Sequence, residues 1–176
     1  MVDKIFEILK QIPNIWDTLD GVSDNCCADE NGEKFIKFDK LKEYLSLEMT
    51  KGMNSACSCD MLFLKTSENH IVFIEFKDLS NVADFREWIG AECRKENTLL
   101  KISDSIFLLS FFLNKQHNIN FDDYFKIKQS FILAYRVDSS VKKIQAHLNF
   151  TSRYNFILQN NLSMSCDKFY NNWLSK

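Results

Sequence analysis

Residues 59–77, CDMLFLKTSENHIVFIEFK, decide the fold of this chain. Two short apolar runs, 59–64 and 71–77, flank the polar segment 65–70, which is the pattern of two strands joined by a turn. The second run is β-branched and aromatic with little alternation, which is typical of a strand buried on both faces in the middle of a sheet. We therefore expect a β-hairpin whose second strand is central.

The chain before this hairpin predicts two helices. Apolar residues recur with helical spacing over 3–12, so we expect an amphipathic helix there that Pro13 ends. The polar segment 21–34 holds two glycines and predicts a surface loop. A second amphipathic helix follows, with Asp39 as a candidate N-cap.

The chain after the hairpin alternates between helix and strand. The pattern over 82–113 predicts helix in two pieces that divide near Asn97. Residues 130–137 form another apolar run and predict a strand. From 140 to 176 we expect a helical segment that packs on the body, ending in a short helix that its aromatic residues dock.

Length and composition favour one compact domain. The chain has 176 residues, of which 45% are hydrophobic, and its sixteen Phe suffice for a substantial core. Together with the order of elements, this predicts an α/β domain over 1–176, with a small mixed β-sheet flanked by helices.

Membrane and secretory segments are not expected. The longest apolar stretch, 106–113, is far shorter than the roughly twenty residues that span a bilayer. The first residues are acidic and lack a basic n-region followed by a long apolar run. We therefore expect a cytoplasmic protein without a membrane partner.

The six cysteines are expected to be free thiols, because a chain of this length and hydrophobicity does not need disulfide staples. Two pairs lie close in sequence, but neither has the C-x-x-C spacing of a metal site, so we do not expect a structural metal there. The pairs are Cys26-Cys27 and Cys57-x-Cys59. Cys93 and Cys166 are expected to be small core residues.

Charge is unevenly distributed along the chain. The formal net charge is −2, but the first third is acidic and the last third is basic. Lys142, Lys143 and Arg153 lie among aromatic residues, a combination that suits contact with phosphates and stacking on bases. The alternative is that these are solvated charges around a helical core.

The candidate site lies at one end of the hairpin. Because side chains alternate along a strand, Glu75 and Lys77 face the same side. In an in-register hairpin, Asp60 lies opposite them. Asp60 and Glu75 are then plausible ligands for Mg²⁺ or Mn²⁺, and Lys77 can orient the attacking water or neutralise charge on a phosphate. The alternative is an ion pair of Lys77 with Glu75 or Asp60 at the end of the sheet.

Other catalytic motifs are absent from the sequence. It contains no P-loop and no G-x-G-x-x-G, and its three histidines form no recognisable catalytic motif. Lys101, on the helix after the hairpin, is a candidate for contacting a phosphate, or else a solvated charge on the helix face.

Asp60 and Glu75-Phe76-Lys77, with a helix before the hairpin and a helix and strand after it, resemble the PD-(D/E)XK nuclease superfamily. The resemblance covers about 39–137 and implies a restriction-endonuclease-like core there. In it, Asp60 and Glu75 are the two acids and Lys77 is the lysine of the motif. Glu48 matches the extra acid that some members place on the preceding helix. The chain departs from the pattern at Cys59, where the family name has proline.

The resemblance implies a Mg²⁺-dependent nuclease acting on DNA phosphodiester bonds, in defence, repair or mobile-element biology. The alternative is a catalytically inactive nuclease-fold protein of the inhibitor or immunity type. Its acidic first third would face a basic protein partner. Either protein can also form a homodimer.

Overall fold

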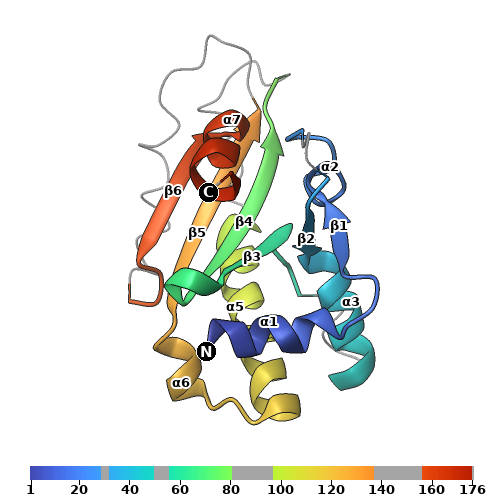
Figure 1. The fold of residues 1–176 in the computed structure, drawn as a ribbon, viewed down its shortest axis with the longest axis vertical. Helices are drawn as coiled ribbons and strands as arrows, with labels where there is room; N and C mark the ends of the chain where they lie inside the picture. The colour runs from blue at the N-terminus through green and yellow to red at the C-terminus, as the bar shows by residue number, and fades with distance from the viewer. Residues whose placement is uncertain (29–31, 50–55, 81–96, 137–155, 176) are drawn as a thin grey trace.

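A six-stranded mixed sheet organises the computed structural model, which describes residues 1–28, 32–49, 56–80, 97–136 and 156–175 (Figure 1). The strands follow one another in chain order across the sheet. Pairings from β1 to β4 are antiparallel, whereas β4–β5 and β5–β6 are parallel. The strands are β1 Trp16–Thr18, β2 Lys34–Lys37, β3 Met61–Lys65, β4 His70–Asp78, β5 Lys128–Arg136 and β6 Asn160–Ser165.

The hairpin expected over 59–77 is formed by β3 and β4. Their register pairs Met61 with Ile74 and Lys65 with His70. A short 3-10 turn over Thr66–Glu68 joins them, and Asn69 completes it in the left-handed region, with φ 49°. β4 lies between β3 and β5 and is buried from His70 through Phe76. The prediction of a central strand is confirmed.

Helices cover both faces of this sheet. Alternate residues of β4 belong to two separate apolar clusters, as a strand buried on both faces requires. Ile71 and Phe73 pack in the cluster that contains residues of α1, α3 and α5, and Val72 and Ile74 pack in the cluster that contains residues of α2 and α7. The helices are α1 Val2–Lys10, α2 Leu19–Val22, α3 Phe38–Met49, α5 Asn97–His117, α6 Phe121–Phe125 and α7 Cys166–Phe169.

Most of the expected elements are present. α1 matches the predicted first helix, α5 matches the predicted helix piece after Asn97, and β5 matches the predicted strand at 130–137. The second helix is α3, but it begins at Phe38, so Asp39 lies inside its first turn and is not its N-cap. The helix pieces expected before Asn97 and over 141–148 lie outside the described residues.

The sheet is larger than expected, because three strands carry weak sequence signals. β1 and β2 flank the segment expected to be a loop, and each is at most four residues long. β6 lies inside the segment expected to be helical, and its sequence, NNLSMS, is mostly polar. Its backbone pairs with β5, so tertiary context overrides its local propensity. The short helix expected at the end is present as α7, continued by a π-helical turn at Tyr170–Leu174.

Among the described residues, no helix is both long and apolar enough to span a membrane.

Candidate functional site

Asp60 lies beside the end of β4, as the predicted register requires. Its backbone N–H donates to the carbonyl of Ile74 at 3.0 Å, which extends the pairing of β3 and β4 by one residue. One carboxylate oxygen, Oδ2, accepts the backbone N–H of Phe76 at 2.7 Å. These two hydrogen bonds fix the Asp60 side chain against the strand that carries Glu75.

Glu75 and Lys77 share one face of β4, as strand alternation predicts. Their face is the one covered by α5, and Glu75 is fully buried, with 0% of its surface exposed. The ammonium of Lys77 lies 2.9 Å from Glu75 Oε1. The structure therefore contains one of the ion pairs that the sequence left open as an alternative.

Lys101 of α5 lies between the two acids, a position that sequence reasoning missed. Its ammonium donates to Glu75 Oε1 at 2.6 Å and lies 3.5 Å from Asp60 Oδ1. Lys101 was expected to contact a phosphate or to be solvated on the helix face. Only the packing of α5 across the sheet end reveals its place, because 26 residues separate it from Glu75.

The same face of α5 holds the segment that leads into Asp60. Asp104 accepts the backbone N–H of Cys57, and Ser105 Oγ accepts that of Cys59, both at 2.8 Å. Lys101, Asp104 and Ser105 are spaced i, i+3 and i+4, so they project from one side of the helix. This helix face both places Asp60 and supplies its cationic neighbour.

Burial dominates the electrostatics of the two acids. Desolvation, together with the charge of Asp60, raises the pKa of Glu75 to about 7, although both lysines oppose the shift. Desolvation also raises the pKa of Asp60 above its ordinary value. Burial alone would lower the pKa of Lys101, but Glu75 and Asp60 raise it above its usual range. The site thus favours a cation between the acids.

A divalent cation fits this donor set. Asp60 and Glu75 both approach one positively charged atom, the Lys101 Nζ. The second oxygen of Glu75, Oε2, is buried without a hydrogen-bond partner among the described residues. A carboxylate oxygen in that condition is costly unless a cation or water satisfies it. Carboxylate oxygens are the ligands that Mg²⁺ and Mn²⁺ prefer.

Asp39, an acid of α3 that was expected to cap the helix, lies near the site. Asp39 accepts the Ser58 hydroxyl, and its charge contributes to the raised pKa of Asp60. Glu48 follows nine residues later in α3, about 13 Å along a helix axis. The Glu48 side chain itself is outside the described part of the chain.

Three candidate residues for nucleic-acid binding cannot be placed. Lys142, Lys143 and Arg153 all fall within 137–155, outside the described residues.

The expectation of free thiols is wrong for two cysteines. Cys27 and Cys166 form a disulfide across 139 residues of sequence. Local spacing carries no signal for such a pair, because only the fold brings its members together. Of the other cysteines in the described residues, Cys26, Cys57 and Cys59 are free. Cys93 lies outside those residues.

Comparison with known proteins yields no significant match to a family model, a curated protein or a solved structure.

Proposed function

We propose that this chain is a metal-dependent phosphodiesterase that cleaves DNA, with Asp60, Glu75 and Lys77 as its working residues. The observation that carries the proposal is the convergence of Asp60 and Glu75 on a single positive charge at the end of a buried strand. A fold gains little from burying two carboxylates at one point, because each loses its hydration. Perturbed acids of this kind are typical of functional sites.

The protein's own groups have distinct tasks in this proposal. Asp60 and Glu75 hold the cation, Mg²⁺ or Mn²⁺, through oxygen atoms that the backbone of β4 and the helix α5 keep in place. When bound, the cation supplies positive charge for a phosphate oxygen and makes a water more acidic. Lys77, which is partly exposed beside Glu75, orients that water or neutralises charge on the phosphate.

The order of elements around the site supports the proposal. α3, the hairpin β3–β4, α5 and β5 occur in the order that the resemblance to the PD-(D/E)XK superfamily implies. One difference is that α3 separates β2 from β3, so only two strands follow this helix directly. The assignment to DNA, and to defence, repair or mobile-element biology, rests on this resemblance.

The main alternative is a non-catalytic binding protein. The specific observation that favours it is that Lys77 and Lys101 already pair with Glu75, while Lys101 also reaches Asp60. Two acids and two lysines form a balanced cluster that needs no metal. The acidic first third of the chain would then face a basic protein partner.

Metal-induced stabilisation tests the proposal. Mg²⁺ or Mn²⁺ added to EDTA-treated protein should raise the melting temperature of the wild type, because a ligand that binds only the native state stabilises it. The response should disappear in Asp60→Asn/Glu75→Gln. It should persist in Glu68→Gln, a matched acid at the opposite end of the hairpin that pairs with Lys65.

Cleavage of single- and double-stranded DNA should follow the same pattern. An equal metal response in the wild type and in Asp60→Asn/Glu75→Gln would refute these ligands. No metal response and no cleavage by the wild type would favour the binding protein.

A further inference from the structure

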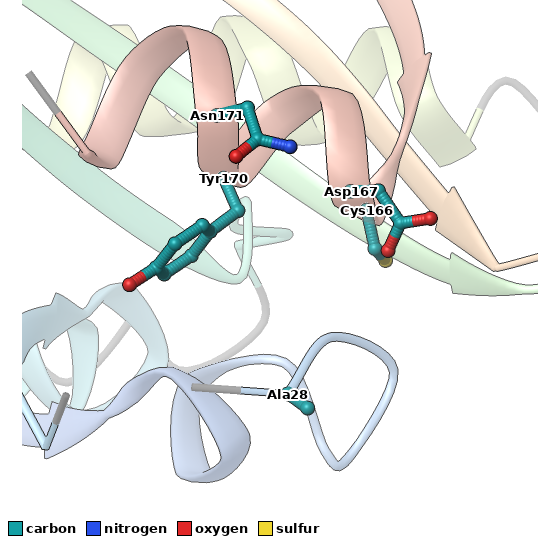
Figure 2. A pocket seen from close by; sticks show the side chains of 5 residues that line it. All are labelled: Ala28, Cys166, Asp167, Tyr170 and Asn171. Atoms are coloured by element: carbon teal, nitrogen blue, oxygen red, sulfur yellow. The ribbon is translucent and has the colours of Figure 1, made fainter. Parts of the chain in front are cut away.

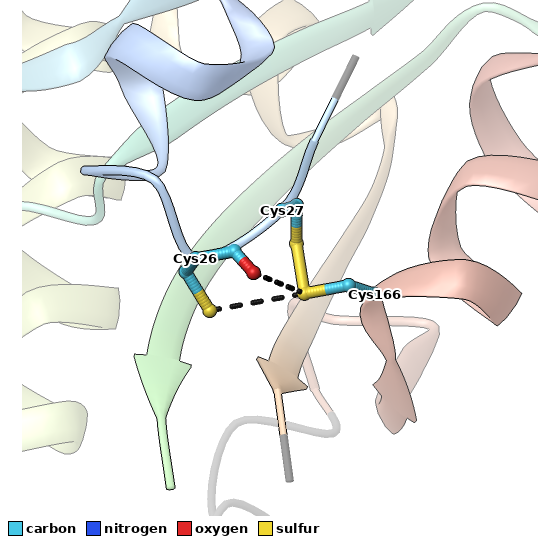
Figure 3. A group of neighbouring side chains, drawn as sticks. All are labelled: Cys26, Cys27 and Cys166. Atoms are coloured by element: carbon cyan, nitrogen blue, oxygen red, sulfur yellow. Dashed lines mark hydrogen bonds between the residues drawn. A yellow bond between two sulfur atoms is a disulfide. The ribbon is translucent and has the colours of Figure 1, made fainter. Parts of the chain in front are cut away.

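Three cysteines from distant parts of the chain meet on the face of the sheet opposite the candidate site (Figure 3). Cys26 and Cys27 follow α2, and Cys166 is the first residue of α7. Their sulfur atoms all lie within 4.8 Å of one another. Cys27 and Cys166 are joined as a disulfide, and Cys26 Sγ lies 3.7 Å from Cys166 Sγ.

The third cysteine is the informative member of the cluster. A disulfide needs only two sulfurs, so it gives no reason for Cys26 to direct its thiol at the same point. In a tetrahedral zinc site with Zn–S bonds of about 2.3 Å, neighbouring sulfurs lie about 3.8 Å apart. The distance between Cys26 Sγ and Cys166 Sγ matches this sulfur–sulfur distance. With the disulfide reduced, three thiolates gathered within 4.8 Å of one another are a ligand set for a soft divalent metal.

Both segments that carry these cysteines are held in place. Ser23 Oγ accepts the Cys27 N–H at 3.0 Å and donates to the Cys27 carbonyl at 3.1 Å. At the start of α7, Ser165 caps the helix by accepting the Lys168 N–H. Cys26 and Cys27 are buried. The cluster is therefore preorganised by the fold as well as by the disulfide.

A cavity of about 340 Å³ opens beside Cys166 (Figure 2). Asp167 lies next to Cys166 in its wall, and Ala28, Tyr170 and Asn171 complete the lining. The cavity gives a metal ion and a reductant a route to Cys166, the member of the cluster that lines it. It also leaves room for a fourth ligand, either the Asp167 carboxylate or a water molecule.

We propose that Cys26, Cys27 and Cys166 form a zinc site in the reduced protein, with a fourth position that faces this cavity. A dithiol reductant makes the three thiols of this site available. The Cys27–Cys166 disulfide is reduced to two thiols, and the reductant is oxidised to a disulfide. Zinc binding then releases the thiol protons to solvent. The disulfide is the metal-free, oxidised state of the same cluster. This site is independent of the proposed nuclease site.

Cobalt substitution tests the site. Co²⁺ added to the full chain, reduced with a phosphine and freed of metal, should produce a thiolate-to-cobalt charge-transfer band that saturates at a single ion per chain. Zinc should abolish the band by displacing cobalt. Cys26→Ser and Cys166→Ser should each weaken cobalt binding at least about tenfold, and Cys57→Ser, which alters a free cysteine elsewhere, should not.

Absence of the band in the reduced wild type, or an unchanged band in Cys26→Ser, would overturn the proposal. The oxidised wild type, in which the Cys27–Cys166 disulfide is intact, is a control that needs no mutation, and it should show no band. If Cys166→Ser fails to fold, thiol alkylation of the reduced wild type, with and without zinc, tests the site instead. Zinc must then protect Cys26, Cys27 and Cys166 but not Cys57, and any other pattern would contradict the site.

Discussion

Lys77 and Lys101 both contact Glu75 Oε1, yet their surroundings differ. Lys101 also reaches Asp60 and comes from a packed helix face, so it compensates both acids. Lys77 lies on β4 beside Glu75, and its side chain is about as exposed as that of Lys101 (25% against 23%). We therefore assign charge balance to Lys101, and we propose a direct role in the reaction for Lys77, as the resemblance to the nuclease motif implies.

For Lys77→Ala we expect a loss of DNA cleavage of at least about a hundredfold, the scale of removing one preorganised charge-stabilising group. Mg²⁺ should still raise the melting temperature of this variant, because Asp60 and Glu75 remain. Lys65→Ala, at the far end of the hairpin, is the matched control and should cleave as the wild type does. Undiminished cleavage by Lys77→Ala would exclude the catalytic role.

His70 gives the protein a separate dependence on pH. Burial, with the nearby charge of Lys128, lowers the pKa of His70 to about 4, and its Nε2 lies 2.8 Å from Ser130 Oγ. The native state therefore keeps His70 neutral between pH 6.5 and 4, whereas the unfolded chain takes up a proton. The free energy of unfolding must fall as the pH falls through this range.

His70→Gln removes this proton uptake and retains a side chain that can hydrogen-bond Ser130. Urea unfolding at pH 7.5 and pH 4.5 should show the wild type losing about 2 kcal/mol more stability than the variant over that interval. The difference therefore reports on His70 together with its neighbour Glu68, whose pKa the His70 charge helps to lower. Parallel losses in both would show that His70 is not held neutral in the fold.

At the scale of elements, β4 contacts the apolar clusters on both faces of the sheet. Its alternating side chains enter both apolar clusters, and its end carries the candidate site. The sheet also changes from antiparallel to parallel pairing at this strand. Packing around β4 therefore controls both folding and the placement of Glu75.

Phe73→Ala in β4 should lower the free energy of unfolding by about 3 to 5 kcal/mol. The substitution leaves a cavity beside Phe38 of α3, whose ring packs against the Phe73 ring. Phe107→Ala is the matched control, since that ring on α5 is 54% exposed and its loss should change stability by less than about 1 kcal/mol. Denaturant midpoints of the two variants measure the contrast. Equal midpoints would show that β4 is not central to the core.

The sequence predicted the elements whose signals are local. β4 is a continuous apolar run, α1 has regular helical spacing, and the hairpin register that places Asp60 beside Glu75 follows from the turn between the strands. β1, β2 and β6 were not predicted, because short or polar strands acquire their structure from the neighbours they pair with.

In the candidate site, too, some residues could be predicted from local sequence signals and others only from tertiary contacts. Asp60, Glu75 and Lys77 come together through strand geometry, which a sequence encodes over a few residues. Lys101, Asp39 and the Cys26–Cys27–Cys166 cluster depend on how helices and loops pack, and no local spacing records that packing. Long-range contacts of side chains are therefore the part of the site that required a structure.

At the scale of the whole molecule, one covalent bond links the loop after α2 to the start of α7. Cys27 and Cys166 are 139 residues apart, so their link restricts nearly the entire unfolded chain. On the chain-entropy model, a loop of this length corresponds to about 5 kcal/mol of stabilisation.

Reduction by a phosphine in the presence of EDTA should lower the free energy of unfolding of the wild type by up to about 5 kcal/mol. Cys166→Ser should match the reduced wild type and show no further response to reductant. Cys26→Ser, which leaves the disulfide intact, should behave as the wild type does. A wild type that is indifferent to the reductant would show that the link does not constrain the unfolded chain.

The same bond determines how the molecule would bear a mechanical load. A force applied at the two termini passes through the Cys27–Cys166 link and bypasses β2 to β6, which lie between those residues, whereas β1 precedes Cys27. In the oxidised protein, stretching can therefore extend only the residues outside the link. Reduction would release the 139-residue span, adding roughly 480 Å of extensible length. The redox state would thus decide whether a pull on the chain ends can extend the span of chain that carries the candidate site.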